Sequence, residues 1–407
     1  MRQSILPSEA GAFETPQRRA TLATLRRHAA PLLAWLATFC YAAWQLVAQQ
    51  KLFLHTFLVE RVGNPGVAKL PLGYGNVLAL KSIMLWQQLR GDPDALKDVQ
   101  HRIYQRIHRR LQARGVATGQ VRPLAEYRMD EITPRRFYRE HVRRGVPCVL
   151  RGFVPASDRW HFAQLAERFP NAIGQVMEKR TKRVFSTTLR AIFEDGRREY
   201  IAEQALLDQN PALKDYFEVE RSNAYFPVLG RSSKPILSFL IIGLGSGLNA
   251  NFHCEESVNW YLAVSGAKRW TLVEAEYSWL LYPAARGTGL RRFSAFLADE
   301  EGEPRDKAAY PLAAYAPRYE VVLRPGDVLY FPAWMWHKTV NLDDEGLGVT
   351  CRYAPTTVMS NRYFRALQLL SPAFWTDSVK VLTALIRRDM TGLEDASEQN
   401  EQESVLI

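Results

Sequence analysis

Cysteine is scarce in this sequence, and no disulfide or zinc-binding pattern is present. The four cysteines, Cys40, Cys148, Cys254 and Cys351, lie far apart and form no Cys-x-x-Cys pair. A disulfide framework and a zinc knuckle are therefore excluded as organising features. The sequence also has no Asn-x-Ser/Thr sequon, which disfavours a glycosylated secreted protein.

Acidic residues are outnumbered by basic ones. The chain has 53 Lys and Arg against 42 Asp and Glu, which gives a formal net charge of +11. This balance favours contact with a membrane surface, nucleic acid or an anionic substrate. Of the 407 residues, 47% are apolar and 23% are charged, as in a folded protein with a real core. The length suits two domains rather than one.

Charge is absent from residues 29–48, which follow a basic N-terminal segment, residues 1–28. Twenty helical residues span about 30 Å, the thickness of a bilayer's hydrocarbon core. We therefore expect a single-pass transmembrane helix here, with a buried core helix as the alternative. The arginines before it favour a cytoplasmic N-terminus. Basic residues continue downstream at Lys69 and Lys81, so the side of the membrane stays open.

Residues 49–122 are expected to form a helical region. Apolar residues recur at steps of three and four between Asp94 and Arg114, which predicts an amphipathic helix with a basic outer face. We interpret that face as solvated, with acidic lipid as the next candidate. No nucleic-acid recognition motif is present, so nucleic acid is disfavoured as a partner. The predicted apolar face comprises Leu96, Val99, Ile103, Ile107 and Leu111.

The chain changes character over residues 123–358. Short runs of aromatic and β-branched residues, separated by Gly and Pro, predict a mostly-β antiparallel barrel or sandwich after a few short helices. Residues 359–390 return to a helical pattern and either pair two chains in a homodimer or pack on the core. The acidic segment 391–407 is expected to be disordered.

Histidine is sparse in the β-rich part: after residue 161 only His253 and His337 remain. Alternate residues of a strand share a face, so Asn251, His253, Glu255 and Asn259 are predicted to lie on one side. Buried polar groups without partners cost about 1–3 kcal/mol each, so this polar row needs something to bind.

Two imidazoles and one carboxylate form the facial triad of non-haem Fe(II) enzymes, and His253, Glu255 and His337 are the candidates. A lone His-x-Glu is a weak signal. The distal segment strengthens it, because the turn Pro325–Asp327 enters a strand that ends at a Trp-flanked His337. A core histidine among aromatic residues is the alternative interpretation of His337.

Four segments together resemble the JmjC, or cupin-like, branch of Fe(II)/2-oxoglutarate oxygenases. They are HCE at 253–255, NWYLAVSGAKRWTL at 259–272, LRPGDVLYFPAWMWH at 323–337 and GVTCRY at 348–353. With the lead-in DEITPRRFYREHVRRGVPCVLRGF, the resemblance covers roughly residues 125–355. It implies a double-stranded β-helix, or jelly-roll, barrel with flanking helices.

The resemblance also implies a cosubstrate site. His253, Glu255 and His337 would hold Fe(II), with 2-oxoglutarate and O₂ as cosubstrates. Lys268 lies fifteen residues after the first of these histidines, where the family places the lysine that pairs with the distal carboxylate of 2-oxoglutarate. Asn259 matches another position that contacts this cosubstrate. A fixed cation and a few amide or hydroxyl donors suit a dicarboxylate.

Tyr200 matches a tyrosine of the same pocket, but two positions depart from the family pattern. Ala250 stands where a Ser or Thr is common, three residues before the first ligand histidine. The strand after the second histidine commonly carries an Asn, and Thr350 is its nearest equivalent in sequence. Each lost hydrogen bond to a charged ligand costs about 1.5–3 kcal/mol, or about one to two decades of affinity.

The implied reaction couples decarboxylation of 2-oxoglutarate to hydroxylation, with release of succinate and CO₂. A protein or peptide side chain is the expected substrate, and demethylation is the variant outcome when hydroxylation falls on an N-methyl group. A membrane-anchored binding or scaffold module without catalysis is the second hypothesis, supported by Ala250 and Thr350. A metal-dependent isomerase is the third and weaker one, because such sites usually carry more imidazoles.

Overall fold

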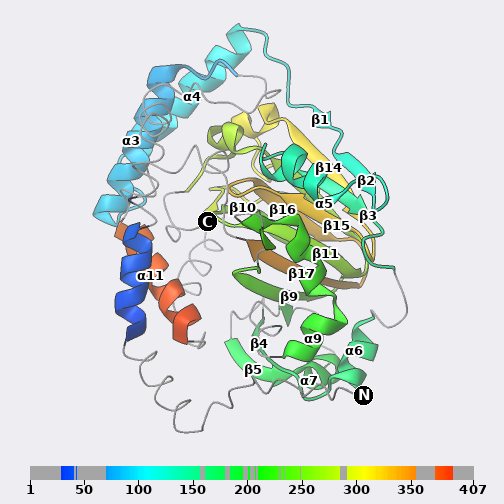
Figure 1. Ribbon diagram of the computed structural model, residues 1–407. Helices are drawn as coiled ribbons and strands as arrows, with labels where there is room; N and C mark the ends of the chain where they lie inside the picture. Colours follow the sequence, from blue (N-terminus) through cyan, green and yellow to red (C-terminus); the bar gives the residue numbers. More distant parts are fainter. Residues whose placement is uncertain are drawn as a thin grey trace, which may run out of the picture.

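Two facing six-stranded sheets form the centre of the molecule, with helices around them (Figure 1). This architecture is seen in a computed structural model. The residues that it describes are 29–40, 43, 70–155, 161–178, 184–195, 200–201, 207, 210–228, 231–232, 234–247, 249–284, 291–353 and 372–387. The predicted mostly-β fold with flanking helices is confirmed.

The sheets are built mainly from antiparallel pairs; the short strands β1 and β2 pair in parallel with their neighbours. The first sheet contains, in spatial order, β1 (Val121–Arg122), β14 (Arg318–Leu323), β12 (Lys268–Val273), β16 (Trp336–Asn341), β10 (Asn249–Glu255) and β13 (Arg291–Phe293). The second contains β2 (Ala125–Arg128), β3 (Cys148–Arg151), β15 (Val328–Phe331), β11 (Val258–Ser265), β17 (Glu345–Tyr353) and β9 (Leu237–Leu244).

Successive side chains of each strand point to opposite faces of its sheet, and this gives the molecule two separate hydrophobic cores. Tyr261, Trp270, Leu329 and Phe331 belong to an inner cluster contributed by strands of both sheets. Trp260 and Tyr330, their neighbours along the same strands, belong to a larger outer cluster shared with the helices. This alternation follows from the two-residue period of a strand. The inner faces are therefore the place where a barrel site can form.

Smaller elements surround the barrel (Figure 1). A three-stranded sheet and a hairpin are made of β4 (Ile173–Glu178), β5 (Val184–Thr188), β6 (Tyr200–Ile201), β7 (Pro227–Val228) and β8 (Arg231–Ser232). The short helices are α5 (Pro134–Phe137), η2 (Tyr138–Val142), α6 (Phe162–Arg168), α7 (Leu189–Glu194), α9 (Pro211–Tyr216), η4 (Val219–Tyr225), η5 (Ala275–Leu281) and η6 (Pro311–Tyr315).

A helical hairpin of α3 (Tyr74–Arg90) and α4 (Lys97–Ala113) covers the first sheet's side of the barrel (Figure 1). Ile103, Ile107 and Leu111 of α4 are buried, as the amphipathic pattern predicts. Leu96 and Val99 are exposed instead. The helix starts only at Lys97, and Leu96 adopts a left-handed conformation before it, so the apolar stripe reaches the core one turn later than predicted.

The transmembrane helix predicted over residues 29–48 is not supported. Residues 29–40 and residue 43 are helical. Among the described residues, no helix combines the length and the apolar character that crossing a bilayer requires. Residues 41, 42 and 44–48 of the predicted span lie outside the described part of the chain.

The C-terminal helix α11 (Pro372–Arg387) contacts α3 of the same chain. Phe374 is buried in the structure. The core-packing interpretation thus has a direct contact behind it, while pairing of two chains stays a prediction. The acidic segment 391–407 lies outside the described residues.

Candidate metal centre

Neighbouring antiparallel strands bring the two histidines together. His253 of β10 and His337 of β16 are direct partners in the strand register. Their ring centroids are 4.0 Å apart. The long sequence separation of these residues is bridged entirely by strand pairing, so the sheet fixes the position of both imidazoles.

Glu255 completes the group at the end of β10. One carboxylate oxygen, Oε1, lies 3.7 Å from His337 Nε2. The ligand atoms offered by His253, Glu255 and His337 all lie within 4.8 Å of one another. Metal–ligand bonds of about 2.1 Å at right angles place ligand atoms about 3 Å apart. A small contraction of these side chains around an ion would therefore close the site.

The hydrogen bonds of both imidazoles suit metal binding. His253 Nδ1 lies 2.8 Å from the backbone oxygen of Asn251, and His337 Nδ1 lies 3.0 Å from that of Met335. A carbonyl only accepts, so each Nδ1 carries the proton and donates it. The lone pair is then on Nε2, which is the usual arrangement of a metal-ligating histidine.

A β-bulge corrects one prediction about this strand. The register between β10 and β16 shifts between Ala250 and His253, so the simple alternation of sides is interrupted there. The Asn251 side chain donates to Ser294 Oγ and to the backbone oxygen of Phe296. Asn251 therefore anchors the segment after β13 instead of joining the polar row beside His253.

The loop before His337 is tied to the other ligand strand. The backbone N–H of Trp334 donates to the backbone oxygen of Glu255 at 2.7 Å. Trp334 is fully buried and has a φ of 62°, a left-handed conformation that costs about 1–2 kcal/mol for a non-glycine residue. Strain of this kind persists where the surroundings fix it, often at functional sites.

The predicted turn Pro325–Asp327 forms and is held by its aspartate. Gly326 has a φ of 90°, which the turn requires. Asp327 accepts hydrogen bonds from the backbone N–H of Gly152 and of Arg324, and its Oδ2 lies 2.6 Å from Arg151 Nη1. This network fixes the start of β15, the strand that leads through the tight loop to His337.

Aromatic rings surround the histidines on the inner face. The His337 ring lies 4.6 Å from the Phe331 ring and 5.9 Å from the Trp270 ring, measured between centroids. His253 stacks at 6.1 Å on Phe293. These rings shield the buried imidazole of His337 from water and strengthen electrostatic interactions there, whereas His253 is only partly buried.

Lys268 lies in the barrel interior near the predicted cosubstrate position. It is 6% exposed, and its Nζ lies 5.4 Å over the Tyr261 ring. Burial lowers the pKa of this ammonium group to about 8. In the strand register Leu272 is opposite His337, so Lys268 is four residues away along β12, about 13 Å. An extended lysine side chain and a dicarboxylate together span such a distance.

The other predicted cosubstrate residues have different settings. Asn259 and Thr350 are buried and lie on the inner faces of β11 and β17. Asn259 donates to the backbone oxygen of Ser257. Tyr200 lies on β6, where it pairs with Glu178 and where its strand contacts β9.

Arg352 is the residue that sequence reasoning missed. It forms an ion pair with Oε2 of Glu255, on the side of the carboxylate away from His337. In the register of β11 and β17, the residue opposite Asn259 is Arg352, whereas Thr350 lies opposite Tyr261. The sequence does show Arg352 as a charged residue within an apolar strand. Its contact with Glu255 could not be predicted, because it depends on how two strands far apart in the sequence pair.

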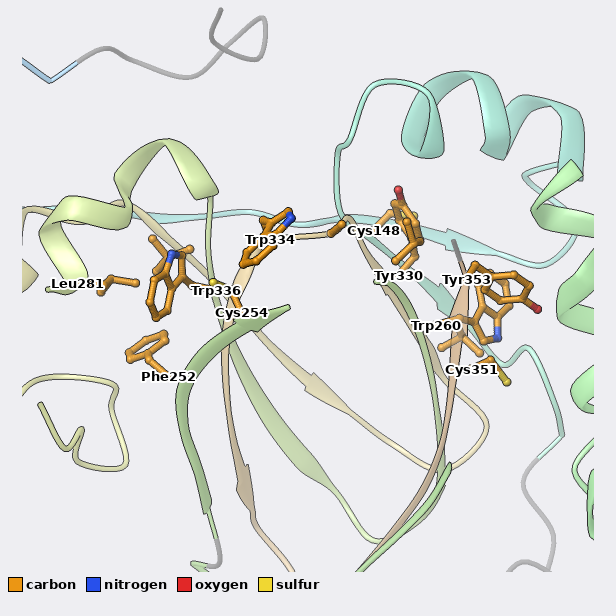
Figure 2. Close-up of a cluster of buried hydrophobic side chains, with 14 of the residues drawn as sticks. Cys148, Phe252, Cys254, Trp260, Leu281, Tyr330, Trp334, Trp336, Cys351 and Tyr353 are labelled. Atoms are coloured by element: carbon orange, nitrogen blue, oxygen red, sulfur yellow. The ribbon is translucent and has the colours of Figure 1, made fainter. Parts of the chain in front are cut away.

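The buried cysteines lie in the outer core. Cys254 sits beside Trp336 and Phe252, while Cys351 lies apart, beside Trp260 and Tyr353 (Figure 2). All four cysteines are free thiols. Burial raises the pKa of the Cys254 thiol well above its usual range, so the thiol stays neutral. Cys254 therefore packs in the core between His253 and Glu255 and is not a metal ligand itself.

Comparison with known proteins finds similarity to cupin-like and JmjC proteins. Residues 171–368 match the family model of the cupin-like domain. The chain is 29% identical over 140 residues to Jumonji C domain-containing protein 5 of Drosophila melanogaster, and 34% identical over 119 residues to JmjC domain-containing protein 8 of Homo sapiens. It is 24% identical over 220 residues to lysine-specific demethylase JMJ21 of Arabidopsis thaliana.

These matches are partial in both directions. They cover 34%, 29% and 48% of this chain in the order given, and 33%, 38% and 22% of the respective relatives. The chain thus spans well under half the length of each. With the cupin-like domain match and the His-Glu-His group, they place the chain in the JmjC, or cupin-like, family, whose members use Fe(II), 2-oxoglutarate and O₂.

We expect the wild-type chain to bind one Mn(II), a redox-stable substitute for Fe(II), and His337→Ala to weaken that binding by at least about 100-fold. Loss of a residue that merely supports a ligand already costs about 10–100-fold. Electron paramagnetic resonance of free Mn(II) gives the affinity, and circular dichroism checks the fold. His101→Ala, on the exposed part of α4, is the control. Unchanged Mn(II) affinity in a folded His337→Ala variant would contradict the site.

Proposed function

We propose that this chain is an Fe(II)- and 2-oxoglutarate-dependent oxygenase that hydroxylates a protein side chain and releases succinate and CO₂. The observation that supports it best is the joint placement of the His253–Glu255–His337 group and the buried Lys268 on the inner faces of one barrel. Bound Fe(II) supplies the redox chemistry and the activation of O₂.

The chain's own residues supply binding, orientation and exclusion of water. In the proposal, Lys268 holds the distal carboxylate of 2-oxoglutarate, and Asn259 and Thr350 offer an amide and a hydroxyl from the facing sheet. Trp270 and Phe331 provide the apolar lining of the site along the stretch from Lys268 to the imidazoles. Tyr200 stays in the proposal as a further contact from β6.

Two other outcomes are compatible with the same centre. Demethylation follows if the hydroxylated carbon belongs to an N-methyl group, and one relative is named a lysine-specific demethylase. A catalytically weak scaffold module is the alternative if the missing hydroxyl at Ala250 leaves 2-oxoglutarate too weakly bound. We favour hydroxylation because the segment before the barrel resembles the hydroxylase-type members.

Succinate formation tests the proposal directly. Aerobic incubation with Fe(II), ascorbate and 2-oxoglutarate is expected to yield succinate from the wild-type chain, and none above background from His253→Ala. The reason is that the imidazole of His253 is one of only three candidate protein ligands in this group. Mass spectrometry of succinate gives the readout. Equal succinate from both proteins would sink the oxygenase assignment.

The buried ammonium of Lys268 generates a pH prediction. Its pKa is about 8 because burial disfavours the charged form. The titratable group in contact with it, Tyr261, has a pKa raised by burial and stays neutral across this range. An anionic ligand needs the protonated lysine. Affinity is therefore fully present below about pH 8 and is lost as pH rises through that value.

Titration of the anaerobic Mn(II)-loaded protein with 2-oxoglutarate between pH 7 and 9.5 is expected to show this loss, by up to about tenfold per pH unit. Lys268→Arg keeps its charge over the whole range and should bind with little pH dependence. Lys268→Met should bind weakly at every pH. A wild-type affinity that stays flat to pH 9.5 contradicts the assigned role of Lys268.

We also propose that the helix at 29–40 rests on an anionic membrane surface. Ala30, Ala34 and Thr38 are buried on one face, whereas several large apolar side chains are exposed. The basic residues of segment 1–28 directly precede this helix and suit acidic lipid headgroups. The exposed side chains are Leu32, Leu33, Trp35, Leu36 and Phe39.

Co-sedimentation with vesicles tests this surface. Wild-type protein is expected to bind vesicles containing phosphatidylserine, and the pair Leu33→Ser with Leu36→Ser should weaken binding at least about tenfold, because each buried methylene contributes roughly 0.8 kcal/mol. Exposed Val121→Ser, on β1, is the control. Binding that is insensitive to the helix variant contradicts the proposal.

A further inference from the structure

The metal ligand Glu255 is held from two sides by groups of different charge. Oε1 faces the imidazole of His337, and Oε2 accepts from the guanidinium of Arg352. The carboxylate is only 4% exposed, so water contributes little to its solvation. An ion bound through Oε1 would be separated from the Arg352 charge by a single carboxylate group.

This arrangement has two electrostatic consequences. A guanidinium beside a ligand carboxylate repels a bound metal cation, and it also restricts the carboxylate to one metal-facing oxygen. The same positive charge attracts any anion that binds to the metal. Arg352 is therefore costly for metal affinity and favourable for the affinity of an anionic cosubstrate.

The strand register gives the location of this charge. Arg352 lies opposite Asn259, and Phe331 lies on the other side of Asn259 in the same row of the sheet. Phe331 in turn contacts the His337 ring. Arg352 and Lys268 thus come from different sheets. The guanidinium of Arg352 lies at the metal ligands, and Lys268 lies four residues along β12 from the position opposite His337.

We propose that Arg352 is a positioning residue that supplies the second positive charge of the cosubstrate site and favours an anionic ligand at the metal over a neutral one. Arg352 serves the carboxylate at the metal, and Lys268 serves the distal one. This inference rests on the proposed function, because it assigns a role within the same site.

The competing explanation is purely structural. Removing one partner of a buried ion pair leaves an uncompensated charge, so Arg352 has a structural value regardless of any ligand. A structural role predicts loss of the metal site when Arg352 is replaced. The proposed charge role predicts a different result: replacing Arg352 leaves metal binding intact but weakens binding of the anionic cosubstrate.

The experiment measures both affinities on the full chain. Arg352→Gln retains a hydrogen-bond donor for Glu255 Oε2 but removes the charge. We expect its Mn(II) affinity, followed by electron paramagnetic resonance, to be unchanged or tighter than that of wild type. We expect the affinity of its Mn(II)-loaded form for 2-oxoglutarate, followed by calorimetry, to weaken by roughly tenfold or more.

Two further variants separate charge from local disturbance. Arg352→Lys retains the charge and is expected to stay within about threefold of the wild-type 2-oxoglutarate affinity. Arg324→Gln, in the exposed turn before β15, removes one charge outside the site and should leave both affinities unchanged. Calorimetry with pyruvate, which carries only the carboxylate at the metal, checks this placement: Arg352→Gln should weaken pyruvate binding relative to wild type, and Arg324→Gln should not.

The outcomes distinguish this inference from the proposed function. If wild-type Mn(II)-loaded protein does not bind 2-oxoglutarate, both are overturned. If wild type binds it and Arg352→Gln binds it equally well, the role of Arg352 is overturned and the oxygenase proposal stands. Loss of Mn(II) binding in Arg352→Gln, or an Arg352→Lys variant as weak as Arg352→Gln, also overturns the charge role.

Discussion

The burial of one carboxylate, that of Glu255, is the constraint on which the site depends. An ionised carboxylate removed from water is unfavourable by several kcal/mol unless charges or hydrogen bonds compensate for it. Here Arg352 compensates for the charge on Oε2, while Oε1 faces Nε2 of His337 at 3.7 Å, where a metal ion would bind. The ion pair with Arg352 joins β10 of the first sheet to β17 of the second at this carboxylate.

Strand pairing turns that constraint into geometry. β10 and β16 place the two histidines opposite each other, and the bulge in β10 directs Asn251 away to the segment after β13. The loop before His337 is held by the bond from Trp334 N–H to the Glu255 carbonyl. Each ligand is thus supported by backbone contacts of another ligand's strand, so the three side chains are ordered before any ion binds.

The local pattern of the sequence predicted the residues that strand alternation and motif spacing determine. His253 and Glu255 share a face because they are two residues apart, and the turn at Asp327 is visible in its Pro-Gly-Asp sequence. The partner of Glu255 was not predictable in this way, because Arg352 reaches it through the register of β17 against β11. The apolar run at 29–48 suggested a membrane span, but among the described residues no helix is long and apolar enough to be one.

The charge of Arg352 affects whether the departures from the family pattern at Ala250 and Thr350 weaken cosubstrate binding. Ala250 removes one donor, and sequence spacing alone also suggested a lost Asn at Thr350. The register instead puts Arg352 opposite Asn259, so the position nearest the metal ligands carries a guanidinium, ion-paired with Glu255, in place of a neutral amide. A hydrogen bond to a charged group is about twice as strong as a neutral one. Under the proposed role of Arg352, the site is better suited to a dianion than the sequence pattern suggested.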